Sequence, residues 1–155
     1  QPEVQAQETP VLEEITEDST EEEVTEVEEK VEEIKVARTL TQVDSGKIFT
    51  LSSAGGAFTI TLPTASNGVD GMYYEFFVEE ETPTAAITLA AGSAIVSLVM
   101  KDAGGNASNS TVGTQISNIV IGTSAQKGDW IKMVYYSAEW NAIALSGIND
   151  AITTS

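Results

Sequence analysis

The side chains that most often perform catalysis or hold metals are scarce in this chain and are not grouped. Its 155 residues contain no histidine and no cysteine, which excludes Ser-His-Asp and Cys-His mechanisms, imidazole-bound metals, disulfides and zinc-thiolate sites. Asp70, Asp129 and Glu139 could supply paired carboxylates, and serine with lysine could supply a dyad, but no spacing signature supports either arrangement. Asp129 follows Gly128 at the start of an expected strand, where turn chemistry accounts for it. We therefore expect no enzymatic activity and no cofactor.

Cation binding also lacks a convincing ligand set. Glu79, Glu80 and Glu81 are consecutive, but adjacent strand residues point to opposite faces and cannot converge on one ion. Asp102 and Asn106 lie in a glycine-rich segment, residues 101–113, where they are too sparse for a calcium loop. That segment predicts a long loop. The acidic run predicts a solvated strand end, and we expect no metal site.

Composition divides the chain between Arg38 and Thr39. Residues 1–38 contain no glycine and no aromatic residue, and they carry 14 of the 24 acidic side chains for a net charge of −11. Residues 39–155 carry a net charge of −6 and hold all 12 glycines and every aromatic residue. So acidic a chain is repelled by phosphate backbones and anionic lipid, which excludes nucleic acid as a direct partner. No apolar run reaches the roughly 20 residues of a membrane span, so we expect no membrane partner.

The first 38 residues predict an acidic N-terminal arm. Residues 1–18 combine two prolines with scattered acids and few apolar side chains, so they are expected to be poorly ordered. Residues 19–37 are expected to be helical, because Ser19 and Glu22 fit a capping box and basic residues fall near the end. One narrow apolar stripe would then require a partner, either another protein or copies of the chain in a homotrimer; its residues are Val24, Val27, Val31 and Ile34. The alternative is a solvated tail without a binding role.

Residues 39–155 predict a β domain. Phe58 to Leu62 alternates apolar residues with threonine, and residues 130–136 alternate in the same way. Eight strands are expected, separated by turns rich in glycine, serine and asparagine: residues 47–51, 57–62, 72–79, 85–90, 94–100, 114–121, 129–136 and 140–146. Many short strands predict an all-β fold, a compact antiparallel sandwich or barrel. Trp130 and Trp140 lie at or next to strand ends, where each is expected to cover the core while its indole N–H stays near water.

Three segments of this domain carry a family resemblance. Residues 128–136 (GDWIKMVYY) and 139–147 (EWNAIALSG) resemble a terminal hairpin that recurs in virion proteins of tailed bacteriophages. Residues 45–51 with 59–63 resemble the opening hairpin of that family, and residues 71–78 are similar to its aromatic middle strand. The resemblance covers about residues 44–147, leaves the arm unmatched, and is found in capsid decoration proteins and in fibre or tail-associated chains.

The resemblance implies a capsid decoration, or cement, protein. Such a protein would bind the major capsid protein at the outer surface of an icosahedral shell and stabilise the shell by mass action. A homotrimer would match the local threefold axes, and the arm would extend across neighbouring coat subunits. Two alternatives remain open: a fibre or spike protein that binds host glycans, and a secreted bacterial adhesion module. The chain opens at Gln1 without a secretory signal pattern, and the residues encoded before Gln1 would test the last alternative.

Overall fold

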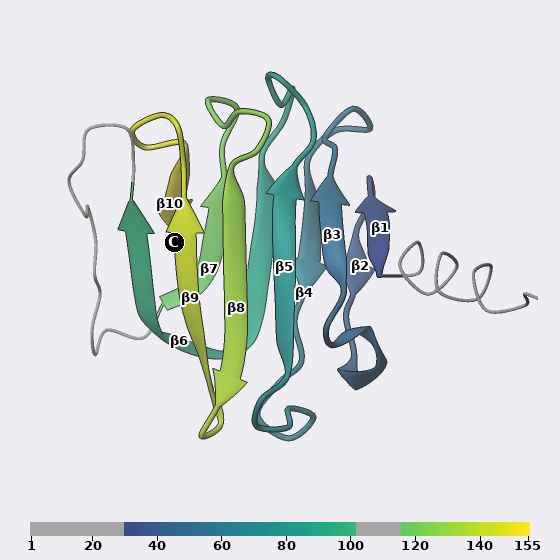
Figure 1. Ribbon diagram of the computed structural model, residues 1–155, viewed down its shortest axis with the longest axis vertical. Coiled ribbons are helices and arrows are strands. Elements are labelled where there is room, and N and C mark those ends of the chain that lie inside the picture. Colours follow the sequence, from purple (N-terminus) through teal and green to yellow (C-terminus); the bar gives the residue numbers. More distant parts are fainter. Residues whose placement is uncertain (1–29, 102–115) are drawn as a thin grey trace, which may run out of the picture.

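The computed structural model describes residues 30–101 and 116–155, with the backbone alone described for residues 92–94 and 96–101. Ten strands and one short 3-10 helix make up the fold (Figure 1). In chain order they are β1 (Val31–Ile34), β2 (Arg38–Thr39), η1 (Gln42–Asp44), β3 (Ile48–Leu51), β4 (Phe58–Thr61), β5 (Tyr73–Val78), β6 (Ile87–Lys101), β7 (Ile116–Ile121), β8 (Trp130–Tyr136), β9 (Glu139–Leu145) and β10 (Ile152–Thr154).

The strands form a sandwich of two mixed sheets with five strands each, and the sheets do not close into a barrel. One sheet has the order β1-β3-β5-β8-β9 and lies toward the viewer in Figure 1. The other contains β2, β4, β6, β7 and β10. Strand β6 joins the two, because its first part pairs with β4 and β7 while its second part pairs in parallel with β9. The register shifts between Ala90 and Ile95, where the strand passes from one sheet to the other.

The first six strands wind alternately through the two sheets. β1, β3 and β5 pair in parallel in the front sheet, and β2, β4 and β6 pair in parallel in the back sheet. Consecutive strands therefore lie in opposite sheets, and each strand from β3 to β6 pairs with the strand two before it in the chain. The remaining strands add antiparallel pairs, β5 with β8, β8 with β9, β6 with β7 and β7 with β10.

The core lies between the sheets and is rich in aromatic rings. Phe49 and Phe76 stack with ring centroids 5.7 Å apart, and Tyr74 and Tyr135 lie 5.6 and 5.0 Å from the Trp140 ring. All five side chains are at most 1% exposed. Burial of side chains this large is the main source of stability in a domain of this size.

The all-β architecture predicted from the sequence is confirmed, with three differences in detail. The sheets are mixed and not wholly antiparallel, because the first six strands pair in parallel within their sheets. The strands expected at 85–90 and 94–100 form one strand, so the turn expected between them is wrong. Strands β1, β2 and β10 were not predicted. The expected long loop lies almost wholly outside the described residues.

The end of the arm also differs from expectation. The helix predicted for residues 19–37 is wrong in its last part, because Val31–Ile34 is a strand paired in parallel with β3. The sheet therefore includes Val31–Ile34, and the compositional boundary at Arg38 falls inside the domain. Residues 1–29, including those expected to be poorly ordered, lie outside the described residues. The opening hairpin expected from the resemblance is not a hairpin, because β3 and β4 lie in different sheets.

Candidate functional site

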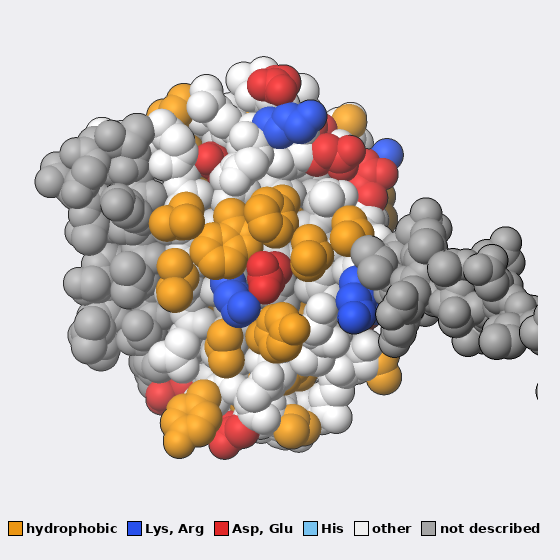
Figure 2. Space-filling model, viewed as in Figure 1, with side chains coloured by type: hydrophobic (Ala, Val, Ile, Leu, Met, Phe, Trp, Pro, Cys, Tyr) orange, Lys and Arg blue, Asp and Glu red, His pale blue; other side chains and the backbone are white. Residues whose placement is uncertain are grey.

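The outer side of the front sheet carries most of the exposed apolar side chains that the structure describes. Eight large hydrophobic residues are exposed, and five of them lie on this side: Val31, Tyr73, Tyr136, Ile143 and Leu145. Half-buried neighbours in the same sheet complete the surface: Ile48, Phe77, Trp130 and Val134. We call these nine residues the apolar face. Figure 2 shows hydrophobic side chains on this side of the molecule gathered around an acidic and a basic group.

Strand alternation produces this face. On β5 the buried residues alternate with Tyr73, Glu75 and Phe77, and on β8 they alternate with Trp130, Lys132, Val134 and Tyr136. The pairing register then aligns the outward residues in rows across the sheet. One row is Val31, Ile48, Glu75, Lys132 and Ile143, and the next includes Thr50, Phe77, Trp130 and Leu145.

A charge pair occupies the centre of the apolar face. The Lys132 Nζ atom lies 3.0 Å from Glu75 Oε1, and Trp130 Nε1 donates to Glu75 Oε2 at 3.2 Å. The same ammonium lies 4.9 Å from the centre of the Tyr73 ring, within reach of a cation–π contact. The carboxylate and the ammonium thus satisfy each other across neighbouring strands and hold Trp130 in place.

A second charged cluster lies where β1 and β2 form the edge of the two sheets, which we call the open end. Glu32 on β1 and Arg38 on β2 point inward from the two sheets and form an ion pair. Arg38 Nη2 also lies 2.9 Å from Asp44 Oδ1, and Lys47 Nζ lies 3.2 Å from the same oxygen and 3.3 Å from Glu32 Oε2. The Arg38 guanidinium is 5.4 Å from the centre of the Phe49 ring. We call these four charged residues the end cluster; inward charges of this kind protect a sheet edge from pairing with another chain.

The end cluster lowers the pKa values of its acids. The hydrogen bond from Arg38 is the largest influence on Glu32 and holds the pKa of Glu32 below its ordinary value. Burial alone would raise the pKa of Asp44, but the Thr41 backbone N–H, Lys47 and Arg38 together outweigh it and lower that pKa. Both groups are therefore stabilised as carboxylates.

The residues that carry the family resemblance at the C-terminal hairpin have a structural explanation. Asp129 is 5% exposed, and its carboxylate accepts bonds from the Gln126 backbone N–H at 3.0 Å, the Ser146 hydroxyl at 2.8 Å and the Gly147 backbone N–H at 2.8 Å. Gly128 before it has a φ of 92°, which favours glycine. The GDW and SG segments thus form a carboxylate bridge between the start of β8 and the end of β9.

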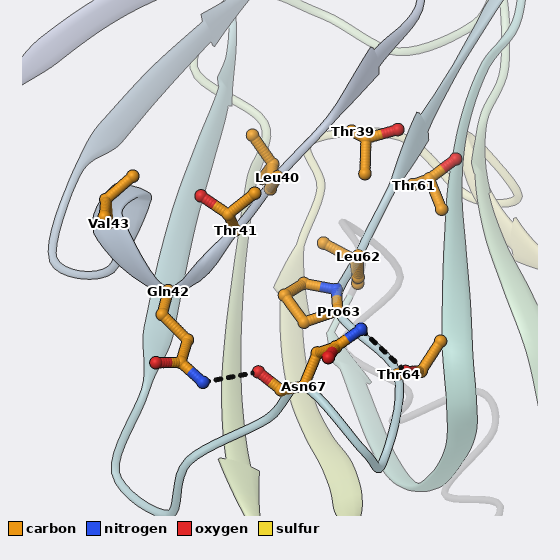
Figure 3. A pocket seen from close by; sticks show the side chains of 10 residues that line it. All are labelled: Thr39, Leu40, Thr41, Gln42, Val43, Thr61, Leu62, Pro63, Thr64 and Asn67. Carbon is orange, nitrogen blue, oxygen red and sulfur yellow. Dashed lines mark hydrogen bonds between the residues drawn. The ribbon is translucent and has the colours of Figure 1, made fainter.

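A pocket of about 410 Å³ lies where β2 and β4 end (Figure 3). Its floor includes Leu40, Leu62 and Pro63, and no ionisable residue lines it. Gln42 Nε2 donates to the Asn67 carbonyl at 2.8 Å, and Asn67 Nδ2 donates to Thr64 Oγ1 at 3.4 Å. The pocket does contain threonine hydroxyls, but none of its lining residues is an ionisable group that could activate them.

The structure separates the four residues of the predicted apolar stripe. Val24 and Val27 lie outside the described residues. Val31 belongs to the apolar face, whereas Ile34 is 3% exposed and packs in the core. Ile34 is therefore not available to a partner, because β1 turns its side chain between the sheets.

The two tryptophans have different roles. Trp140 is fully buried and its Nε1 donates to the Pro63 carbonyl at 3.2 Å, so the expected contact of its N–H with water is wrong. Trp130 faces outward beside Phe77, with ring centroids 6.2 Å apart. Sequence reasoning found Trp130 but missed the face around it, whose signal was the apolar residues at alternate positions of neighbouring strands.

Comparison with known proteins adds no assignment. No protein-family description matches the chain, and no curated protein matches it. Within residues 30–101 and 116–155, no group of three or more acidic residues is arranged to hold a metal ion. Nor does that part of the chain contain a helix long and apolar enough to cross a membrane.

Proposed function

We propose that this chain is a virion structural protein of a tailed bacteriophage, a capsid decoration protein that acts by binding and performs no reaction. The observation that carries this proposal is the apolar face. An exposed patch of contiguous aliphatic and aromatic side chains on a folded domain marks a surface for binding protein. The phage assignment itself rests on the resemblance at residues 44–147.

The distribution of charge supports a second contact, through the residues that precede β1. Residues 1–29 hold twelve acids and no base, whereas all seven lysine and arginine residues lie at or after Lys30. A segment of this composition complements basic patches on a coat subunit. With Ile34 in the core, the apolar anchors proposed for this segment are Val24 and Val27.

Electron cryomicroscopy of particles of the phage that encodes this chain tests the proposal. We expect density for the β domain at repeated positions on the outer shell. Deletion of residues 1–29 leaves every described strand in place, so the truncated domain should fold but be lost from sedimented capsids. The variant Val24→Ser/Val27→Ser should reduce occupancy in the same assay. Density confined to a tail or fibre would contradict the decoration role.

A second candidate, glycan binding by a fibre or spike protein, is favoured by one observation. Trp130, Tyr73 and Phe77 lie around the Glu75–Lys132 pair, and sugars are commonly held between aromatic rings and charged hydrogen-bonding groups. This candidate predicts binding on a glycan array that Trp130→Ala abolishes. The aliphatic residues Val31, Ile143 and Leu145 favour a protein partner instead.

A further inference from the structure

We propose that the apolar face pairs with the same face of a second copy of this chain, sheet against sheet, about a two-fold axis that runs along the strands between β5 and β8. The inference goes beyond the capsid role, because it concerns an association that needs no shell. It rests on the pairing register of the front sheet and on the positions of its two charges.

The register makes the central row self-complementary. Its order across the sheet is Val31, Ile48, Glu75, Lys132 and Ile143. A two-fold axis midway between β5 and β8 places β5 of one copy over β8 of the other, and β3 over β9. Glu75 then faces Lys132 of the second copy, and Lys132 faces its Glu75.

The other rows match equally well. The same axis places Phe77 over Trp130 of the second copy and Tyr73 over its Val134, because each of these pairs is adjacent in the β5–β8 register. Ile48 faces Ile143, and Thr50 faces Leu145. Most apolar positions therefore meet apolar positions, and opposite charges meet at the centre, which is the pattern of an isologous interface.

Two-fold axes at neighbouring positions give unfavourable charge contacts. An axis through β5 would place Glu75 over Glu75, and an axis through β8 would place Lys132 over Lys132. An axis between β3 and β5 would place Glu75 over Ile48 and bury an unpaired carboxylate. Like charges or an unpaired charge at the centre of an apolar interface are strongly unfavourable, so the charge pair selects one arrangement.

The size of the face sets the expected affinity. Five strands about 4.8 Å apart, with about three outward rows roughly 6.7 Å apart along the strands, give a flat area of about 480 Å² per copy. Aligned sheets pack with their strands within about 30° of each other, which the axis permits. An interface this small is below the size of a standard specific interface, so we expect a weak dimer that forms only at high protein concentration. The net charge of −17 opposes association at low salt, so added salt should strengthen the dimer.

The test measures the mass of the full chain by analytical ultracentrifugation over a concentration series. We expect a monomer–dimer equilibrium for the natural sequence. Glu75→Lys places two lysines at each contact, and Lys132→Glu places two glutamates there, so each variant alone should dimerise about a hundredfold more weakly. An equimolar mixture of the two variants should restore the dimer, because the substituted side chain of one variant then faces the substituted side chain of the other, which carries the opposite charge.

Two controls separate this inference from an effect on folding. Glu81→Lys and Lys127→Glu change the charge by the same amounts at exposed positions outside the face and should leave dimerisation unchanged. Circular dichroism establishes that every variant is folded, and the variant Glu75→Lys/Lys132→Glu, which keeps an opposite-charge pair within each copy, should dimerise like the natural chain.

A monomer at all concentrations, a trimer, or a dimer insensitive to the charge changes would each overturn the inference. So would a mixture of folded single variants that stays monomeric. The capsid proposal uses the same face, but it is tested separately by density on particles. A chain that occupies the shell and stays monomeric in solution would overturn this inference alone.

Discussion

The open end of the winding and the apolar face are both places where this domain could join another protein, yet their side chains differ sharply. At the open end, β1 and β2 are the edge strands among the described residues, but Glu32 and Arg38 point between the sheets and the end cluster covers the core with charge. On the apolar face, aliphatic and aromatic side chains remain exposed around one charge pair.

The difference indicates where association is prevented and where it is allowed. An uncovered strand edge above an apolar core invites uncontrolled pairing with other chains, and inward charges suppress it. A flat sheet face has no unpaired backbone groups, so its contacts depend on side chains and can be made specific by one charge pair. Charged side chains thus protect the open end from strand pairing, and apolar side chains form the face where we propose that two copies associate.

Substitution of the two tryptophans should show the largest difference between core and face. Trp140→Ala removes a fully buried ring and should lower the free energy of unfolding by about 3–5 kcal/mol. Trp130→Ala removes a ring that lies on the face and should lower it by only about 1 kcal/mol. Urea denaturation of both variants at low protein concentration measures the two values. Equal losses would show that the face is part of the stabilising core.

The contrast between these tryptophans also marks what the sequence predicts well. The hairpin β8–β9 is local, with Tyr136 paired to Glu139 across the turn at Ser137 and Ala138, and its alternation was sufficient to predict both strands. Strands β3, β4, β5 and β7 were predicted for the same reason. The hydrogen bonds of Asp129 could not be predicted, because Gly147 is distant in the sequence.

The open end could not be predicted from local pattern. Val31 and Ile34 are three residues apart and fit a helical stripe, but parallel pairing with β3 places them on opposite sides of a strand. This pairing joins Ile34 to Leu51, and periodicity within a short window does not report partners so far apart. The apolar face was missed for the related reason that its rows cross five strands.

Neutralising the centre of the end cluster should have the next largest effect. Arg38 is 28% exposed and contacts both Glu32 and Asp44. Arg38→Met keeps the apolar stem but leaves the two carboxylates with Lys47 alone, and it should lower the free energy of unfolding by about 2 kcal/mol. Lys35→Met removes the exposed contact with Glu33 and serves as the matched control, for which we expect no measurable change in the free energy of unfolding. A similar small change for Arg38→Met would show that the end cluster does not stabilise the end.

Acid should destabilise β1 at the end cluster while the hairpin β8–β9 stays folded. Because folding lowers the pKa values of Glu32 and Asp44, their contribution is complete above the ordinary values of 4.5 and 3.8 and is lost as pH falls through the lower values of the folded state. Hydrogen exchange compared at neutral pH and below pH 3.8, after correction for intrinsic rates, should show protection lost in β1 before β8 and β9. The Arg38→Met variant should show a smaller change with pH. Simultaneous loss in all three strands would contradict a local effect.

The smallest effect on stability is expected on the apolar face itself. Ile143 and Leu145 are 47% and 43% exposed, and threonine keeps the β propensity of these positions, so Ile143→Thr/Leu145→Thr should change the free energy of unfolding of the monomer by about 0.5 kcal/mol or less. The same variant removes apolar contacts from both copies of the proposed pair and should weaken dimerisation at least tenfold. Urea denaturation at low concentration measures the first value and ultracentrifugation the second. A face that serves association alone must show the second change without the first, whereas a large loss of stability in the monomer would assign these side chains to the fold.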